Sequence, residues 1–310
     1  MKEKFMQKSW VVWLGALICC FLWGSAFPCI KIGYGLMEIE SGDTAAQILY
    51  AGIRFFLAGV LAIIIGSLGQ KKLLYPSKKA IPKVIKLSMF QTVLQYLFFY
   101  VGLAHTTGVR ASIIEGVNVF VVIVVASLIF HQEKLTARKL IGGIIGFAGV
   151  VLVNLAGGSA GGSFSLLGDG FIFLSTVAYG FSSVYLKRYS KEYNTVMLSG
   201  YQFVFGGVIM AICGLLAGGR LTVWRGSGIA MLIYLALVSA VAYSLWGILL
   251  TYNPVSKVAV FGFMNPVFGV LLSALFLSEK DTLGWSSILA LVLVCLGIYI
   301  VNHQPTGLEE

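Results

Sequence analysis

The sequence predicts an all-α integral membrane protein, with ten transmembrane helices arranged as two inverted-topology five-helix repeats. Three observations predict this fold: long apolar runs, a one-sided distribution of basic residues, and a similarity between the two halves. Of the 310 residues, 58% are hydrophobic and only 11% are charged, whereas about a quarter of the residues of a soluble domain are charged. A run of about 20 apolar residues crosses the hydrocarbon core of a bilayer. Because such runs fill nearly the whole chain, we expect the function to lie in the membrane.

Breaks of glycine, proline and charge divide the chain into ten apolar segments. The expected spans are 10–35, 44–68, 83–104, 107–130, 137–155, 167–188, 195–217, 228–251, 256–277 and 283–302. The same breaks predict five units, namely a cytoplasmic N-terminus (1–9), a first repeat (10–155), a Gly/Ser-rich external loop (156–166), a second, inverted repeat (167–302) and a C-terminal tail (303–310).

Basic residues collect at one side of the expected bundle. The N-terminus and the even-numbered connections hold 16 lysines and arginines, whereas the odd-numbered connections hold four. Positively charged loops are retained in the cytoplasm, so we expect both termini there and the chain in the cell membrane. This retention also explains the net charge of +10, and nucleic acid is therefore not an expected partner.

The two halves of the chain resemble each other. When residues 104–134 are shifted by 146 positions, eight of them meet identical partners. They are Val109, Gly116, Val121, Val124, Ser127, Phe130, Glu133 and Lys134, which meet Val255, Gly262, Val267, Val270, Ser273, Phe276, Glu279 and Lys280. After a two-residue insertion, Gly149 aligns with Gly297. Because five spans is an odd number, the second copy enters the membrane inverted, which is a transporter architecture with its substrate site near the midplane.

Short motifs recur in a fixed order along the chain. They are Trp23-Gly24-Ser25-Ala26-Phe27 with Lys31, Arg54-Phe55, Ala111-Ser112, Glu133-Lys134-Leu135-Thr136 and Asn265-Pro266-Val267. In these motifs, from about residue 12 to residue 302, the chain resembles the drug/metabolite transporter superfamily, in its ten-helix EamA branch. The resemblance implies alternating access, a central cavity lined by spans 1–4 and 6–9, and peripheral spans 5 and 10. It also implies that the substrate is an amino acid, another metabolite or a toxic compound, commonly moved outward.

Three charged side chains lie well inside the expected spans, namely Lys31, Arg54 and Glu115. A charge at this depth needs a partner or water. At 1.5 Å per residue, Arg54 and Glu115 lie roughly 3 and 5 Å outside the midplane, whereas Lys31 lies higher and can snorkel to the interface. Glu115 replaces a small apolar residue of the family pattern. It is a candidate for substrate binding and proton coupling, for a permanent ion pair with Arg54, or for exposure in a watery vestibule. Arg54 either recognises a carboxylate or ties its helix to backbone carbonyls.

Uncharged polar and aromatic side chains complete the candidate substrate site. Gln91 and Gln95 share one face of span 3, where they either line the cavity or join helices. Asn118 shares a face with Glu115, which it is positioned to orient. The aromatic candidates are Trp23, Tyr179, Tyr243 and Trp246. These four side chains either pack together or offer ring faces to a flat or cationic solute.

The leading functional hypothesis is a secondary active exporter of small metabolites, with amino acids or other zwitterionic or amine solutes first. The alternative is an exporter of aromatic or quaternary ammonium drug-like cations. An intramembrane enzyme would need a paired acid and base or a metal cluster, which the sequence lacks, so no catalytic residue, cofactor or metal ion is expected. A channel or a scaffold is the other alternative. The expected partners are a small-molecule substrate, the lipid bilayer and protons as coupling ion, and a monomer is sufficient for a complete pathway.

Overall fold

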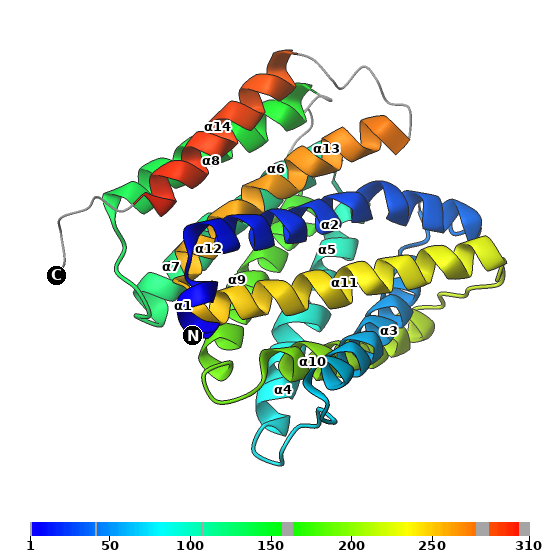
Figure 1. Cartoon of the computed structure of the whole chain (residues 1–310). Coiled ribbons are helices and arrows are strands. Elements are labelled where there is room, and N and C mark those ends of the chain that lie inside the picture. Colours follow the sequence, from blue (N-terminus) through cyan, green and yellow to red (C-terminus); the bar gives the residue numbers. More distant parts are fainter. Residues whose placement is uncertain (1, 41, 107, 157–163, 277–284, 304–310) are drawn as a thin grey trace.

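The computed structural model of the chain consists of helices joined by short connections (Figure 1). It describes residues 2–40, 42–106, 108–156, 164–276 and 285–303, and no β-strand occurs among them. The first half contains α1 (Lys2–Met6), α2 (Ser9–Leu36), α3 (Thr44–Gln70), α4 (Ile81–Ser88), η1 (Met89–Leu94), α5 (Gln95–Ala104), α6 (Gly108–Gly116), α7 (Asn118–Val124), η2 (Val125–Ile129) and α8 (Ala137–Ala156). The second half contains η3 (Leu166–Gly170), α9 (Phe171–Tyr189), α10 (Thr195–Leu216), α11 (Gly226–Tyr252), α12 (Val255–Ala259), η4 (Val260–Phe263), α13 (Met264–Phe276) and α14 (Trp285–Asn302).

Ten helical rods occupy the ten segments expected to cross the membrane. Among the described residues, six rods are by themselves long and apolar enough for a span. They are Ser9–Leu36, Thr44–Gln70, Ile81–Ala104, Leu166–Tyr189, Thr195–Leu216 and Gly226–Tyr252. Shorter apolar helices and α8 supply the other four spans. The prediction of an all-helical membrane protein with ten spans is confirmed. Most of the expected loop 156–166, most of the tail 303–310 and the repeated pair Glu279-Lys280 lie outside the described residues.

Four of the spans change their helical geometry within the described residues. The third contains the π-helical segment η1, the fourth breaks at Val117 and ends in the π-helical segment η2, the sixth begins with the π-helical segment η3, and the ninth contains the 3-10 segment η4. Pro266 gives a reason for η4, because a proline has no N–H to bond the carbonyl four residues earlier, at Gly262, and so disfavours regular α-helix there. Gln95 directly follows η1, and Asn118 directly follows the break at Val117.

The packing of the helices relates the two halves by an approximate two-fold axis. The first span, α2, packs against α11 and α13, which belong to spans eight and nine. Its counterpart α9 packs against α5 and α7, which belong to spans three and four. The second and seventh spans, α3 and α10, pack against each other, and so do the fifth and tenth spans, α8 and α14. Contacts that are exchanged between the halves in this way are those expected of two repeats with opposite orientation.

Glycines bring the backbones of α3 and α10 together. A Cβ on Gly52 would lie 2.9 Å from the carbonyl oxygen of Gly207, and one on Gly59 would lie 2.5 Å from that of Gly200. Gly200 follows Gly52 by 148 positions, and Gly207 follows Gly59 by the same number. Gly52 therefore meets the counterpart of Gly59, and Gly59 meets the counterpart of Gly52. Small residues allow this close approach of membrane helices. We refer to these four residues as the glycine crossing.

The outer helices α8 and α14 are also brought together by glycines. A Cβ on Gly142 would lie 2.9 Å from the carbonyl oxygen of Gly297, and one on Gly297 would lie 2.5 Å from that of Gly142. The α8–α14 pair lies at the periphery of the bundle (Figure 1). This position agrees with the peripheral place that the family resemblance implies for spans five and ten.

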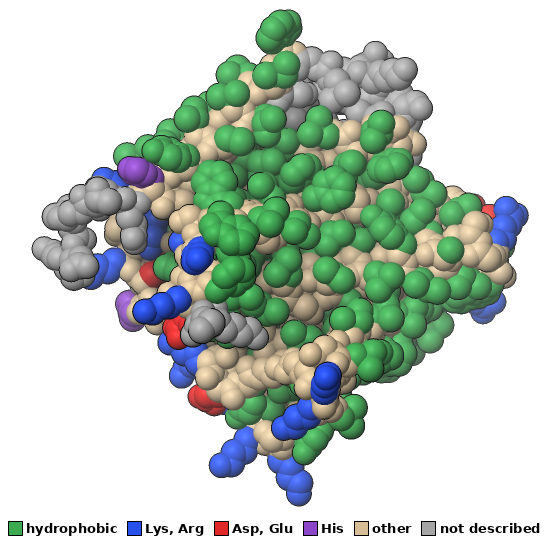
Figure 2. Space-filling model, viewed as in Figure 1, with side chains coloured by type: hydrophobic (Ala, Val, Ile, Leu, Met, Phe, Trp, Pro, Cys, Tyr) green, Lys and Arg blue, Asp and Glu red, His purple; other side chains and the backbone are tan. Residues whose placement is uncertain are grey.

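The surface of the molecule is divided between an apolar band and charged ends. Large apolar side chains are exposed along α2 and α14, among them Leu14, Phe21, Ile288 and Leu296. Figure 2 shows hydrophobic side chains across one broad face, whereas most lysines and arginines lie beyond it. We call the end that carries residues 2–8, 71–80, 131–136, 190–194, 253–254 and 303 the basic end. An exposed apolar band of this kind faces lipid.

Candidate functional site

The predicted site residues come from eight elements of both halves. Trp23 lies on α2, Arg54 on α3, Gln91 on η1, Gln95 on α5, Glu115 on α6, Asn118 on α7, Tyr179 on α9, and Tyr243 and Trp246 on α11. Arg54, Gln91, Tyr243 and Trp246 are buried, with no more than 4% of each exposed. The other five are half-buried. The four buried side chains therefore lie inside the bundle.

Three of the predicted aromatic residues are in direct contact. The ring of Trp23 lies edge-on to those of Tyr243 and Trp246, with centroids 5.0 and 5.1 Å apart. Tyr96, which the sequence analysis did not select, extends this cluster, because its hydroxyl lies 2.7 Å from that of Tyr243. Tyr96 directly follows Gln95, and a search of that helix for hydroxyl-bearing aromatics would have found it. Edge-on aromatic pairs are a favourable packing geometry, so packing explains part of this cluster.

Glu115 is held by the second repeat. Its carboxylate accepts a hydrogen bond of 3.2 Å from the hydroxyl of Ser175, which is fully buried on α9. The Ser175 hydroxyl also lies 2.7 Å from the carbonyl oxygen of Ile172. Ser175 lies one helical turn before the predicted Tyr179, so the periodicity of this helix gave a signal for it. The contact links span 4 to span 6 within the membrane.

Arg54 lies in a group of tyrosines. The hydroxyls of four tyrosines are close enough to interact electrostatically with its guanidinium, and these residues are Tyr34, Tyr50, Tyr96 and Tyr100. Its guanidinium carbon lies 4.4 Å from the centroid of the neighbouring Phe55 ring. The buried Nε of Arg54 has no hydrogen-bond partner among the described residues. We refer to Arg54 and these four tyrosines as the tyrosine group.

Arg54 and Glu115 do not form an ion pair with each other. Both side chains belong to the described part of the chain, and no contact of 4.0 Å or less joins their charged atoms. Instead, both side chains lie within electrostatic range of the Tyr243 hydroxyl, Arg54 on α3 and Glu115 on α6.

The buried interior also contains polar atoms that lack a protein partner. Trp23 Nε1, Gln91 Oε1 and Gln95 Oε1 have no hydrogen-bond partner among the described residues. Buried polar groups are almost always hydrogen-bonded, so these atoms need a partner from outside the described residues, such as water or a polar solute. Thr92 of the same span does join two helices, because its hydroxyl donates a hydrogen bond of 2.6 Å to the side-chain oxygen of Gln202 on α10. The Oε1 atoms of Gln91 and Gln95 make no such hydrogen bond between helices among the described residues.

Two predicted residues are placed differently from the rest. Asn118 follows the break at Val117, and its Oδ1 lies 3.7 Å from where a Cβ on Gly262 would be, so it faces η4. Tyr179 interacts electrostatically with Cys19 and Cys20 of α2 and with Tyr96. Tyr179 thus lies on α9 within electrostatic range of α2 and α5, whereas Asn118 faces the ninth span.

Comparison with known proteins gives the family of the chain. The sequence profile of the EamA-like transporter family matches residues 9–155 and again residues 166–303. An uncharacterized transporter of Archaeoglobus fulgidus is 30% identical over 306 residues, which cover 96% of this chain and 100% of that protein. A protein of Escherichia coli named a probable amino-acid metabolite efflux pump is 25% identical over 303 residues, with 92% of each chain covered.

The fold also matches a solved structure. A crystal structure of a protein superposes with a TM-score of 0.75 at 17% sequence identity, and covers 93% of this chain and 94% of the other. Two family matches account for nearly the whole chain, one in each half. The chain is therefore a multi-pass membrane transporter of a small-molecule substrate, not an enzyme, and it belongs to the EamA-like transporter family.

Proposed function

We propose that this transporter exports small metabolites that carry an amine, with amino acids and other zwitterions first. The observation that carries the proposal is that Arg54 and Glu115, on different helices, both lie within electrostatic range of Tyr243 and form no ion pair with each other. In this proposal the solute carboxylate binds near Arg54 and the tyrosine group, and the solute amine binds near Glu115. The 25% identical relative named a probable amino-acid metabolite efflux pump supports this choice of substrate.

Alternating access supplies the transport cycle of the proposal. The Glu115–Ser175 hydrogen bond joins spans of opposite repeats, so it is made or broken when the repeats move relative to each other. Glu115 alternates between holding a proton and holding the solute amine, which makes the proton the coupling ion. A single chain contains both repeats, so the proposed transport unit is a monomer with repeats 10–155 and 167–302.

The distribution of basic residues supports an orientation with both termini in the cytoplasm. The N-terminal segment and the connections 71–80, 131–136 and 190–194 all lie at the basic end. Since positively charged loops are retained in the cytoplasm, this end is the cytoplasmic one in our proposal.

A thermal-shift measurement on the purified protein tests the substrate class. Amino acids, the amines formed by removing their carboxylate, and organic cations are added separately at pH 6 and pH 8, because a ligand that binds the folded state raises its apparent stability. Stabilisation by amino acids but not by the matching amines is the expected result. Flux assays with the stabilising solutes in proteoliposomes then distinguish a carrier, which exchanges substrate, from a channel. Absence of stabilisation by every amino acid would contradict the zwitterion site.

A second candidate substrate class is aromatic or quaternary ammonium cations. The contact among Trp23, Tyr243 and Trp246 favours it, because these rings lie beside the part of the bundle that contains Glu115. Ring faces attract cations. Stabilisation by hydrophobic cations alone in the same screen would select this candidate and leave Arg54 with a structural role.

A further inference from the structure

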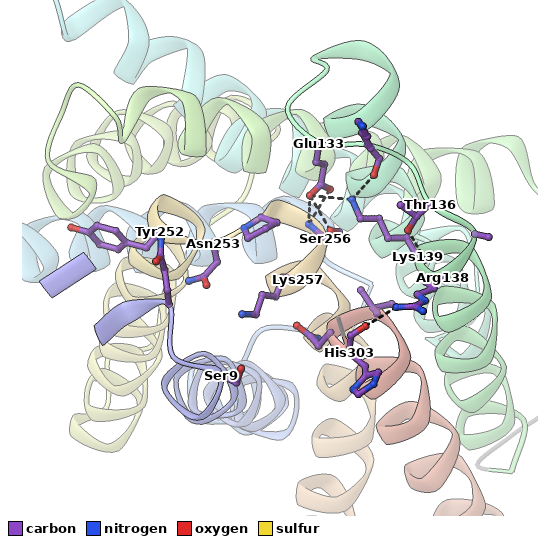
Figure 3. A pocket seen from close by; sticks show the side chains of 16 residues that line it. Ser9, Glu133, Thr136, Arg138, Lys139, Tyr252, Asn253, Ser256, Lys257 and His303 are labelled. Atoms are coloured by element: carbon purple, nitrogen blue, oxygen red, sulfur yellow. Dashed lines mark hydrogen bonds and ion pairs between the residues drawn. The ribbon is translucent and has the colours of Figure 1, made fainter. Parts of the chain in front are cut away.

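A cavity of about 930 Å³ opens at the basic end of the bundle, apart from the candidate substrate site. Its walls come from the start of α2, the connection before α8, the segment between α11 and α12, and the end of α14. Figure 3 shows these segments around the cavity. None of the predicted substrate-site residues lines it. One wall is the peripheral α8–α14 pair, so the cavity lies toward the edge of the bundle.

The lining of this cavity carries an excess of positive charge. Its cationic side chains are Lys134, Arg138, Lys139 and Lys257. The carboxylate in the lining is that of Glu133, and it is already used within the protein. It accepts hydrogen bonds from the backbone N–H of Ser256 at 3.1 Å and from the Ser256 hydroxyl at 2.9 Å, and it lies 3.4 Å from the ammonium of Lys139. The remaining cations therefore line the cavity without a carboxylate partner from the part of the chain that the structure describes.

Lys257 is the cation best placed to receive a ligand. It is half-buried on α12, and the described residues supply no hydrogen-bond or ion-pair partner for its ammonium. Figure 3 shows its side chain extending into the space bounded by Asn253, Ser9 and His303. Arg138 stands at the opposite wall, where one of its nitrogens donates a hydrogen bond of 3.3 Å to the carbonyl oxygen of His303. A guanidinium has five donors, so Arg138 keeps others for a ligand.

We infer that this cavity binds an anionic phosphate group, with Lys257 as its central contact. A partly desolvated ammonium beside a guanidinium and neutral donors is suited to phosphate oxygens. Basic pockets between helix ends at the membrane surface bind the headgroups of anionic phospholipids. The framing elements expose large apolar side chains such as Trp10, Ile144 and Leu296, which suit acyl chains. The site differs from the substrate site in place and in chemistry, and the inference does not depend on the proposed function.

Lipid titration of the full-length protein in a zwitterionic detergent tests this site. The probes are short-chain phosphatidylglycerol, short-chain phosphatidylcholine and inorganic phosphate, and the readout is the apparent melting temperature as a function of probe concentration. Phosphatidylglycerol is expected to stabilise the wild type, and phosphatidylcholine is not. Lys257→Gln is expected to require about fivefold more phosphatidylglycerol, the effect of removing one basic contact. Lys257→Arg, which keeps the charge, is expected to respond as the wild type does.

Two further variants control the experiment. Lys78→Gln removes a charge from an exposed connection at the same end of the molecule, and its titration is expected to match that of the wild type. Lys134→Gln removes an exposed cation of the lining. If Lys257→Gln does not fold, the same phosphatidylglycerol titration of Lys134→Gln tests the site instead. Inorganic phosphate that stabilises the wild type but not Lys257→Gln would identify a soluble phosphate compound as the ligand. Equal responses of the wild type and both lining variants to every probe would overturn the inference.

Discussion

The hydroxyl groups of Tyr96 and Tyr243 lie 2.7 Å apart and join α5 of the first repeat to α11 of the second. Tyr243 also contacts the ring of Trp23 and interacts electrostatically with both Arg54 and Glu115. One phenol thus connects the aromatic cluster, the tyrosine group and the intramembrane carboxylate. This position makes Tyr243 the residue at which the proposed substrate site is tested most directly.

Replacing Tyr243 by phenylalanine keeps the ring and removes the hydroxyl. A hydrogen bond contributes about 0.5–1.5 kcal/mol net, so we expect the affinity for the stabilising solute to fall about threefold to tenfold. Tyr96→Phe is expected to lower the affinity by a similar factor. In the double variant the loss of binding free energy is expected to be smaller than the sum of the two single losses, because both changes remove the same contact. The affinities come from the thermal-shift titrations. Tyr75→Phe, in an exposed connection, is the control, and strictly additive effects would argue against a shared role.

Glu115→Gln keeps the shape of the side chain but removes its exchangeable proton. Transport driven by a pH gradient is expected to fail, whereas exchange of solute across the membrane persists. Ser175→Ala removes the hydroxyl that donates to Glu115 and is expected to weaken both activities only moderately. Uptake into proteoliposomes measures each activity separately. Full pH-driven uptake by Glu115→Gln would remove the coupling role, and Glu192→Gln at the surface controls for the loss of a charge.

The glycine crossing makes a prediction about stability that is independent of transport. A methyl group on Gly52 would lie 2.9 Å from the carbonyl oxygen of Gly207, so Gly52→Ala forces the helices apart and is expected to cost about 1–3 kcal/mol. Gly69 lies near the end of the same helix with open space around it. Gly69→Ala is therefore expected to be neutral or stabilising by up to about 1 kcal/mol. Melting temperatures in detergent compare the two, and equal changes would contradict the packing argument.

The surface pair of Lys83 and Glu192 predicts a pH dependence of stability. The ammonium of Lys83 lies 2.6 Å from the Glu192 carboxylate and holds the pKa of that carboxyl below its ordinary value of 4.5. The unfolded state then binds more protons than the folded state as the pH falls. The contribution of the pair is therefore complete above pH 4.5 and is lost as the pH falls through the lower, folded-state value.

Glu192→Gln tests this relationship. The melting temperature of the wild type is expected to exceed that of the variant slightly at pH 7, and the difference is expected to shrink below pH 4.5. Because both side chains are partly or largely exposed, added salt should reduce the difference. A difference that stays constant from pH 7 to pH 3.5 would be evidence against the pair.

Hydropathy and charge predict the architecture because the bilayer restricts it. Each span must be helical and apolar over a fixed length, so the ten segments follow directly from the sequence. The inverted repeat follows from identities such as Gly149 with Gly297. Changes of helical geometry are harder to predict, since the break at Val117 and the π-helical turn at η1 depend on tertiary packing rather than on local propensity.

The candidate site is predicted less completely than the fold. Periodicity shows which side chains share one face of a helix, as Tyr243 and Trp246 do on α11. It cannot show which faces meet, so the contact of Glu115 with Ser175 and the tyrosines around Arg54 were not foreseen. The cavity at the basic end could not be predicted from the sequence either. The segments that form it, around residues 9, 138, 257 and 303, are far apart in the chain.

The glycine crossing has the geometry of an isologous dimer interface. In such an interface residue i of one copy meets residue j of the other, and j meets i in return. Gly52 and Gly207 meet in this way, and so do Gly59 and Gly200. A half-length chain inserted in both orientations would form the same contact with a second copy of itself. The single chain thus joins its two halves through a contact that has the symmetry of an interface between two identical five-helix proteins.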